Sequence, residues 1–226
     1  MSNWQTLAKK FNGIGPQITT AEGKTFRIKL LLGTDAVHNN QHIVGTILFP
    51  HNSGLACAHN PANFFNQGYW TGLNVKTSGF NYAFAPTVAI SHNPQWGRFY
   101  ETMGQEEGMV YDYAKQFVAG LQNIDSKGVW GGVVGSVKHF FGDGSTIHGA
   151  NEGNARVISF KGYVNRNIQG YKGAMASEIG TLMCSYSAIN GVPMSISSWL
   201  GDYLKGKLGF DGFVISDYDV MRNYNT

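Results

Sequence analysis

Six short apolar runs, each ending at a polar or charged residue beside glycine or proline, constrain the fold of this 226-residue chain most strongly. They lie at 27–35, 46–52, 81–90, 133–140, 181–187 and 212–217. Short apolar runs bounded by turn residues predict buried β-strands. Segments of helical composition separate most of them, at roughly 58–77, 101–122, 158–178 and 197–208. The chain is therefore predicted to alternate between strands and helices.

The segment 101–122 carries the clearest helical pattern. Its apolar residues recur at spacings of three, four and seven, which predicts an amphipathic helix with one face packed on a sheet. These residues are Met103, Val110, Tyr113, Ala114, Phe117 and Leu121.

Alternating strands and helices predict a parallel sheet, and reactive residues gathered after the strands favour an α/β fold of the (β/α)8 barrel type. A doubly wound sheet is the alternative, although no GxGxxG turn follows any strand. A complete barrel takes about 250 residues. We therefore expect 1–226 to be most of one barrel domain, incomplete, with an eighth strand on its C-terminal side and a first strand ahead of Asn3 needed to close the sheet.

Composition narrows the class of function. The net charge is only +3 and no basic run occurs, which argues against nucleic acid as a partner. No apolar run approaches the length of about 20 residues that a membrane span needs, and no signal peptide is visible at Met1. The histidines lack metal-site spacing, so we expect no metal and no cofactor. Cys57 and Cys184 lack a CxxC spacing and are predicted to be buried free thiols.

Two aspartates follow strongly apolar strands. Asp217 comes after Gly212 to Ile215, and Asp35 comes after a run of leucines. A strand would aim each carboxylate at the mouth of a barrel, where it can attack or bind a substrate. Each could equally cap the N-terminus of a following helix.

Two further pairs of residues are candidates for ligand binding. Lys138 and His139 are adjacent at the end of a strand, and because successive strand residues point to opposite faces, both reach one ligand only if the strand has ended there. Trp96 and Arg98 lie in one turn, where an aromatic face and a guanidinium could hold a sugar ring, although ordinary packing is equally compatible.

Taken together, the chain resembles glycoside hydrolase family 3 in its β-glucosidase and exo-β-glucanase branch. Single motifs are weak, but their order and spacing are specific and span nearly the whole chain. The motifs are Gly33-Thr34-Asp35-Ala36-Val37-His38, Phe49-Pro50-His51-Asn52, Ala85-Pro86, Pro94-Gln95-Trp96-Gly97-Arg98, Lys138-His139-Phe140-Phe141-Gly142-Asp143-Gly144, Asn151-Glu152, Ser185-Tyr186-Ser187 with Asn190-Gly191, and Gly212-Phe213-Val214-Ile215-Ser216-Asp217.

This resemblance implies a retaining hydrolase that releases terminal nonreducing β-D-glucose from β-glucans, cello-oligosaccharides or β-glucosides. Asp217 matches the family nucleophile, and the acid/base of this branch is a glutamate on a following domain. The resemblance thus implies that 1–226 are most of an N-terminal barrel domain, with a C-terminal domain beyond it. The residues that match the sugar pocket are Asp35, Arg98, Lys138 and His139, with Tyr186, Met183, Glu152 and Tyr218 around them. Family members are often extracellular or periplasmic.

The sequence departs from the family pattern at several positions. Tyr218 replaces the usual tryptophan after the nucleophile, and Asn39 replaces a glycine. The hexosaminidase branch carries an Asp-His pair where this chain has Gly149 and Asn151, which favours glucosides. Two alternatives stay open: an inactive, sugar-binding or incomplete domain, and an aldolase-like barrel in which Lys138 would form a Schiff base.

Overall fold

Five parallel strands form the main sheet of the computed structural model, which describes residues 17–27, 30–129 and 131–220. Their order across the sheet is β10-β7-β5-β4-β3. The strands are β3 (Gly33–Thr34), β4 (Tyr82–Ala83), β5 (Val134–Phe140), β7 (Thr181–Cys184) and β10 (Phe213–Ile215). Each new strand is added on the same side of the sheet, as in a barrel.

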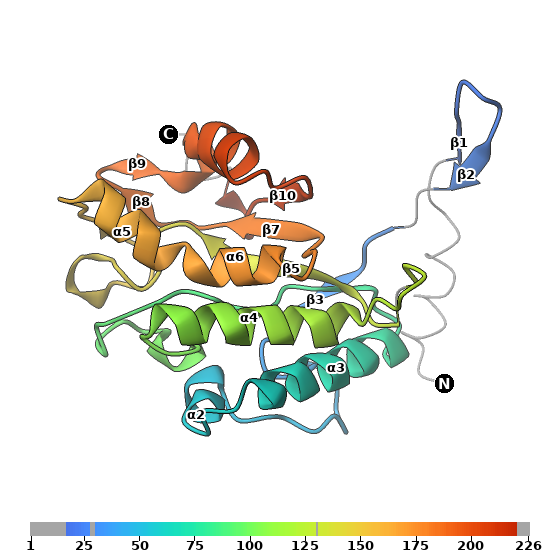
Figure 1. The fold of residues 1–226 in the computed structure, drawn as a ribbon, viewed down its shortest axis with the longest axis horizontal. Helices are drawn as coiled ribbons and strands as arrows, with labels where there is room; N and C mark the ends of the chain where they lie inside the picture. Colours follow the sequence, from blue (N-terminus) through green and yellow to red (C-terminus); the bar gives the residue numbers. More distant parts are fainter. Residues whose placement is uncertain (1–16, 28–29, 130, 221–226) are drawn as a thin grey trace.

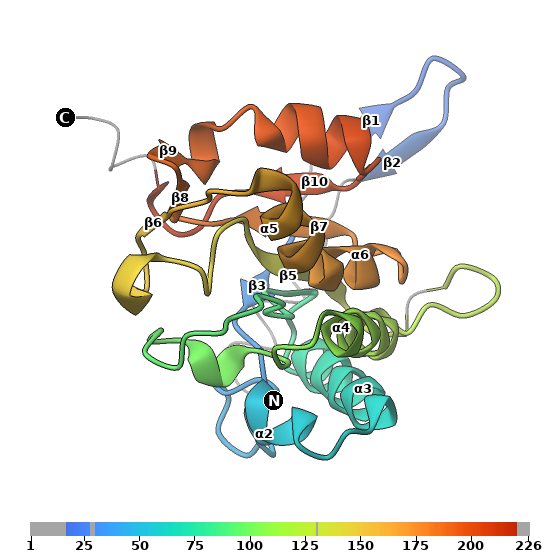
Figure 2. The same ribbon diagram turned by 60° about the vertical axis from the view of Figure 1, so that its left-hand side comes forward.

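Helices α3 (Pro61–Thr77), α4 (Glu107–Gln122) and α6 (Gln169–Met175) pack side by side along one face of this sheet (Figures 1 and 2). A doubly wound sheet would instead reverse its strand order and carry helices on both faces. The fold is therefore α/β of the barrel type. The barrel is not closed in the described part of the chain, because β3 and β10 remain at opposite edges.

Two small sheets lie outside the main one. β1 (Gln17–Thr19) and β2 (Thr25–Arg27) form an antiparallel hairpin, which projects away from the rest of the molecule (Figure 1). β6 (Asn154–Ala155), β8 (Ala188–Ile189) and β9 (Val192–Pro193) form the other. Asn190 and Gly191, both with positive φ, make the two-residue turn between β8 and β9 that an Asn-Gly pair favours.

Local sequence explains where α3 and α4 begin and end. Asn60 caps α3 by accepting a hydrogen bond from the backbone N–H of Ala62 at 3.0 Å, and Pro61 occupies the first turn. Asn123 ends α4 in the left-handed conformation. The amphipathic prediction for α4 is confirmed, since Val110, Tyr113, Ala114, Phe117 and Leu121 are all buried.

Several predicted boundaries differ from the structure. α4 begins six residues later than position 101, because Gly104 adopts a φ of 125° that a helix does not allow. Met103 is still buried, but from a loop. The predicted helix 158–178 divides into α5 (Phe160–Asn167) and α6, and 197–208 contains a π-helical segment, Leu200–Lys207. Short 3₁₀ turns occupy Phe99–Glu101, Ile147–Gly149 and Met194–Ile196.

The strand predicted at 46–52 is wrong. Residues 46–50 form irregular backbone, and α2 (Asn52–Ala56) follows. Ile47 is 79% exposed, and the N–H of Phe49 donates to the carbonyl of His38 instead of to a neighbouring strand. The predicted strands 27–35 and 81–90 shorten to β3 and β4, and part of the first lies outside the described residues.

The prediction for the cysteines is half right. Cys184 is buried, but Cys57 is exposed at the end of α2. In the described part of the chain, no helix combines the length and the apolar character needed to cross a bilayer.

Candidate active site at the strand ends

Charged side chains from three strand ends and one loop meet at the carboxyl edge of the main sheet. Asp35 follows β3, Lys138 and His139 lie near the end of β5, Asp217 follows β10, and Arg98 belongs to the loop after β4. The Nζ of Lys138 donates to Oδ1 of Asp35 at 2.6 Å. Lys138 is buried while the Asp35 side chain is 49% exposed, so this carboxylate remains available to a ligand.

Lys138 and His139 both reach the cluster, although β5 continues through Phe140. The pairing of β5 with β7 shifts register between Val137 and Phe140. An irregularity of this kind redirects side chains that would otherwise alternate between the two faces. The condition stated for this pair, that the strand ends before both can act together, is therefore wrong.

His139 joins the two halves of the cluster. Its Nδ1 lies 2.7 Å from Oδ2 of Asp143, and its Nε2 lies 3.3 Å from Nη1 of Arg98 and 3.5 Å from Oδ2 of Asp217. The backbone carbonyl of His139 accepts a 2.6 Å hydrogen bond from Tyr171. Both the ring and the backbone of this residue are thus held in place.

Glu101 orients Arg98 and was not identified from the sequence. Arg98 donates from Nε and Nη2 to the two oxygens of Glu101 at 2.9 and 2.8 Å, and Thr87 donates to the same carboxylate. Burial acts to raise the pKa of Glu101, but the bidentate guanidinium outweighs it and lowers the pKa overall. The i,i+3 spacing of an arginine and a glutamate was the only signal in the sequence.

Asp217 is partly shielded, with 19% of its side chain exposed. Its Oδ1 accepts a 2.7 Å hydrogen bond from the N–H of Tyr218. Residues 218 and 219 form a turn and residue 220 is in 3₁₀ conformation, so the segment that Asp217 could cap lies largely outside the described residues. Asp35 caps no helix, since residues 36–40 are not helical.

The remaining predicted site residues surround Asp217. Tyr186 donates from its hydroxyl to the carbonyl of Tyr218, and burial, with the nearby charges of Asp217 and Glu152, raises the pKa of Tyr186 to about 12. Glu152 itself is exposed, and the Tyr218 side chain is 87% exposed. Met183 is buried at the end of β7, in register with Ile215 of β10.

Trp96 does not present its face to a ligand. The residue is 2% exposed and packs in the interior, with Nε1 3.5 Å from the carbonyl of Asn151. Packing is therefore the correct interpretation for this residue, and within the pair only Arg98 points at the cluster.

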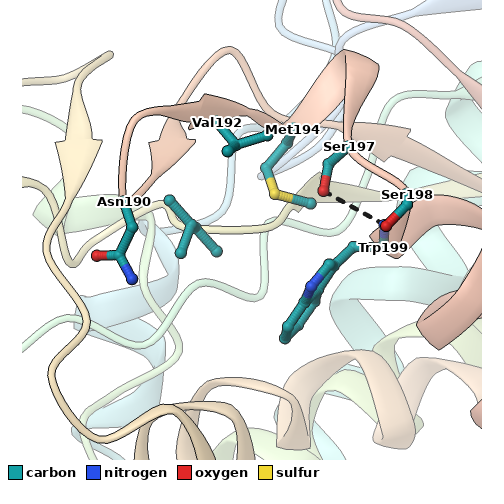
Figure 3. A pocket seen from close by; sticks show the side chains of 7 residues that line it. Asn190, Val192, Met194, Ser197, Ser198 and Trp199 are labelled. Carbon is teal, nitrogen blue, oxygen red and sulfur yellow. Dashed lines mark hydrogen bonds between the residues drawn. The ribbon is translucent and has the colours of Figure 1, made fainter.

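A separate cavity of about 260 Å³ lies between the β8–β9 hairpin and the start of the π-helical segment (Figure 3). The residues that line it are Ile189, Asn190, Val192, Met194, Ser197, Ser198 and Trp199. None of them titrates near neutral pH, so this cavity offers no acid, base or carboxylate nucleophile. This cavity is therefore not an alternative catalytic site to the open cluster around Asp217.

Comparison with known proteins gives the same picture. The glycosyl hydrolase family 3 N-terminal domain matches residues 2–226. A lysosomal β-glucosidase of Dictyostelium discoideum is 29% identical over 214 residues, which cover 91% of this chain and 26% of that protein. A β-xylosidase of Formosa agariphila is 25% identical over 185 residues, covering 80% and 25%. The chain thus spans about a quarter of the length of these curated relatives.

A solved structure agrees in fold. The exo-1,3/1,4-β-glucanase ExoP from a Pseudoalteromonas species superposes with a TM-score of 0.87 and 33% identity, covering 96% of this chain and 27% of that one. The strand order, the charged strand ends and the family match over residues 2–226 lead to the same assignment. The chain belongs to glycoside hydrolase family 3, in the branch of its β-glucosidases and exo-β-glucanases.

Proposed function

We propose that the full-length protein is a retaining glycosidase that removes terminal nonreducing β-D-glucose from β-glucans, cello-oligosaccharides or β-glucosides, with Asp217 as its nucleophile. The observation that carries this proposal is the convergence of Asp217 with Arg98, Lys138, His139 and Asp35 at one edge of the sheet. The Asp217 carboxylate is partly shielded and lies beside the fixed cation Arg98, and a carboxylate in such a place can act as a nucleophile.

In this proposal the carboxylate of Asp217 attacks the anomeric carbon, and the bond to the leaving oxygen breaks as a glycosyl-enzyme forms. Water then releases the sugar with overall retention. Arg98 holds a permanent positive charge near the attacking oxygen. Burial acts to lower the pKa of Arg98, but its pair with Glu101 and the charges of Asp143 and Asp217 raise it overall.

The remaining cluster residues are proposed to hold the sugar. The hydroxyls of a terminal glucose are both donors and acceptors, which suits the half-exposed Asp35 carboxylate, the Lys138 ammonium and the ring nitrogen of His139. We assign Tyr186, Met183, Glu152 and Tyr218 to the wall of the same pocket, because they surround Asp217.

Retention requires a second carboxyl about 5–5.5 Å from the nucleophile, acting first as acid and then as base. We propose that it is a glutamate on a C-terminal domain of the same protein, which also contributes one wall of the pocket. Asp143 is the carboxylate nearest to His139, but it is buried and fully occupied by hydrogen bonds, so it has no path to a leaving group.

The decisive test of the mechanism uses the full-length protein and a 2-deoxy-2-fluoro-β-glucoside with a good leaving group. The fluorine slows both steps, so a retaining enzyme accumulates its glycosyl-enzyme. Peptide mass spectrometry is expected to place the added mass on Asp217. The corresponding 2-fluoro-β-xyloside serves as the comparison, because one relative is a β-xylosidase; faster labelling by that reagent would move the substrate class to xylosides.

A second prediction compares the full-length protein with residues 1–226 alone. Residues 1–226, expressed alone, are expected to hydrolyse aryl β-glucosides at less than about one hundredth of the full-length rate, because general acid catalysis contributes about 10²–10⁴-fold. Circular dichroism and gel filtration report whether the piece is folded. Full-length activity from this piece would show that its acid/base lies within these residues.

The aldolase hypothesis finds no support in the geometry. A Schiff-base lysine must bring its Nζ to the carbonyl of a substrate, whereas the buried Nζ of Lys138 donates a 2.6 Å hydrogen bond to Asp35.

A further inference from the structure

Asp143 is a buried carboxylate that the mechanism above does not use. Only 7% of the residue is exposed, yet three side chains hydrogen-bond to it. His139 lies 2.7 Å from Oδ2, and the hydroxyls of Ser185 and Ser187 lie 2.5 and 3.4 Å from Oδ1. The carboxylate therefore links the end of β5 to the segment that follows β7.

The ionised state of Asp143 determines which ring nitrogen of His139 carries a proton. Burial acts to raise the pKa of Asp143, but the charge and hydrogen bond of His139, together with the bond from Ser185, lower it overall. An ionised carboxylate only accepts hydrogen bonds, so Nδ1 of His139 must be the donor.

The other ring nitrogen faces two groups with opposite requirements. The guanidinium of Arg98, 3.3 Å from Nε2, can only donate, whereas the carboxylate of Asp217, 3.5 Å away, can only accept. With Nδ1 protonated, a neutral ring offers its Nε2 lone pair to Arg98 or to a sugar hydroxyl. The reverse tautomer would leave Arg98 facing an N–H, and would leave the buried Asp143 without a donor from the ring.

We propose that Asp143 is a positioning residue, which fixes the ring orientation and the tautomer of His139 and through it the approach of Arg98 and substrate to Asp217. The inference rests on the proposed glycosidase function where it is tested by kcat/KM. The position of the His139 ring in crystal structures tests it independently of that function. Carboxylates that orient a metal-bound histidine influence activity by about 10–100-fold, and we expect an effect of the same order for the orientation of His139.

A double-mutant cycle in the full-length protein tests the proposal. Asp143→Asn keeps the size and the serine hydrogen bonds but removes the charge, and is expected to lower kcat/KM for an aryl β-glucoside by about 10–100-fold. Asp143 is proposed to act through His139. Combining Asp143→Asn with His139→Ala should therefore lower kcat/KM by no more than about threefold below that of His139→Ala alone. Losses that multiply in the double variant would overturn the proposal.

Gln122→Ala is the matched control for buried polar groups. Gln122 is 1% exposed and accepts from the N–H groups of Gly135 and Gly180, at the opposite end of the same strands. We expect this variant to lower the melting temperature while leaving kcat/KM within about threefold of wild type. If Gln122→Ala lost as much kcat/KM as Asp143→Asn, the effect of Asp143→Asn would be explained by general destabilisation of the fold.

Crystal structures of the full-length Asp143→Asn and Asp143→Ala proteins supply the readout that needs no turnover. The alanine variant is expected to show the His139 ring rotated, or its Nδ1 bonded to a water molecule, with Nε2 moved away from Arg98. A ring that stays in place in both variants, with wild-type kcat/KM in Asp143→Asn, would contradict the proposal. If the wild-type enzyme cleaves no β-glucoside, the proposed function fails, while the ring position still tests Asp143.

Discussion

Replacing Asp217 with alanine in the full-length protein is expected to lower kcat on an aryl β-glucoside by about 10⁴–10⁶-fold, because loss of a covalent nucleophile removes the reaction path itself. The nearest neighbours of Asp217 cannot take over. Tyr186 is held as a neutral phenol, with its pKa raised to about 12, and His139 is bonded to Asp143. Steady-state kinetics with an activated leaving group measure the loss.

A small external nucleophile makes this test specific. In Asp217→Ala the missing carboxylate leaves space on the face from which it attacked, so azide is expected to restore part of the turnover and to give the α-glycosyl azide. Asp211→Asn is the matched control, because Asp211 is an exposed aspartate just ahead of the same strand, β10. It should retain wild-type kcat. An Asp217→Ala enzyme that is equally active would end the assignment of the nucleophile.

Residues at strand ends were predictable because two independent rules apply to them. Parallel strands bring their carboxyl ends to one edge, and apolar runs are easily recognised in the sequence. Asp35, Lys138 and Asp217 were located in this way, and the structure places Lys138 against Asp35 and His139 beside Asp217. Their catalytic and binding roles remain predictions that the experiments above test.

The roles of the supporting residues were harder to predict, because they depend in part on contacts between segments that are distant in the sequence. Asp143 entered the sequence analysis only as part of a motif, but in the structure it is bonded to Ser185, 42 residues away. Trp96 was considered for a sugar platform, yet tertiary packing buries it. Neither outcome follows from local spacing, since burial depends on which segments the complete sheet brings together.

The run at 46–52 shows the limit of apolar patterning. Threonine, isoleucine, leucine and phenylalanine in sequence favour a strand. Pro50 has no N–H to donate, and Asn39 bonds through its side-chain amide to the carbonyl of Ile47, so this stretch is tied to a loop and not to a sheet. Here side-chain hydrogen bonding outweighed β-propensity.

Gly68→Ala is expected to destabilise the barrel domain by about 2–4 kcal/mol, although alanine is the better helix former. α3 and α4 cross with glycines at their contact. An added Cβ at Gly68 would overlap the carbonyl oxygen of Phe117 and lie 2.9 Å from the backbone nitrogen of Leu121. Backbone atoms cannot rotate away, so the two helices must separate, and the apolar contact between them is lost.

The matched control is Gly108→Ala, a glycine in the first turn of α4 where an added Cβ meets nothing within 4 Å. Helix propensity acts alone there, so this variant should gain about 0.5–1 kcal/mol. The same substitution therefore has opposite signs at two positions of one helix pair. Calorimetry of the full-length proteins, with hydrogen exchange across α3 and α4, measures both effects. A Gly68→Ala protein as stable as Gly108→Ala would show that the helices do not approach as closely as the structure describes, because only that close approach makes the added methyl group harmful.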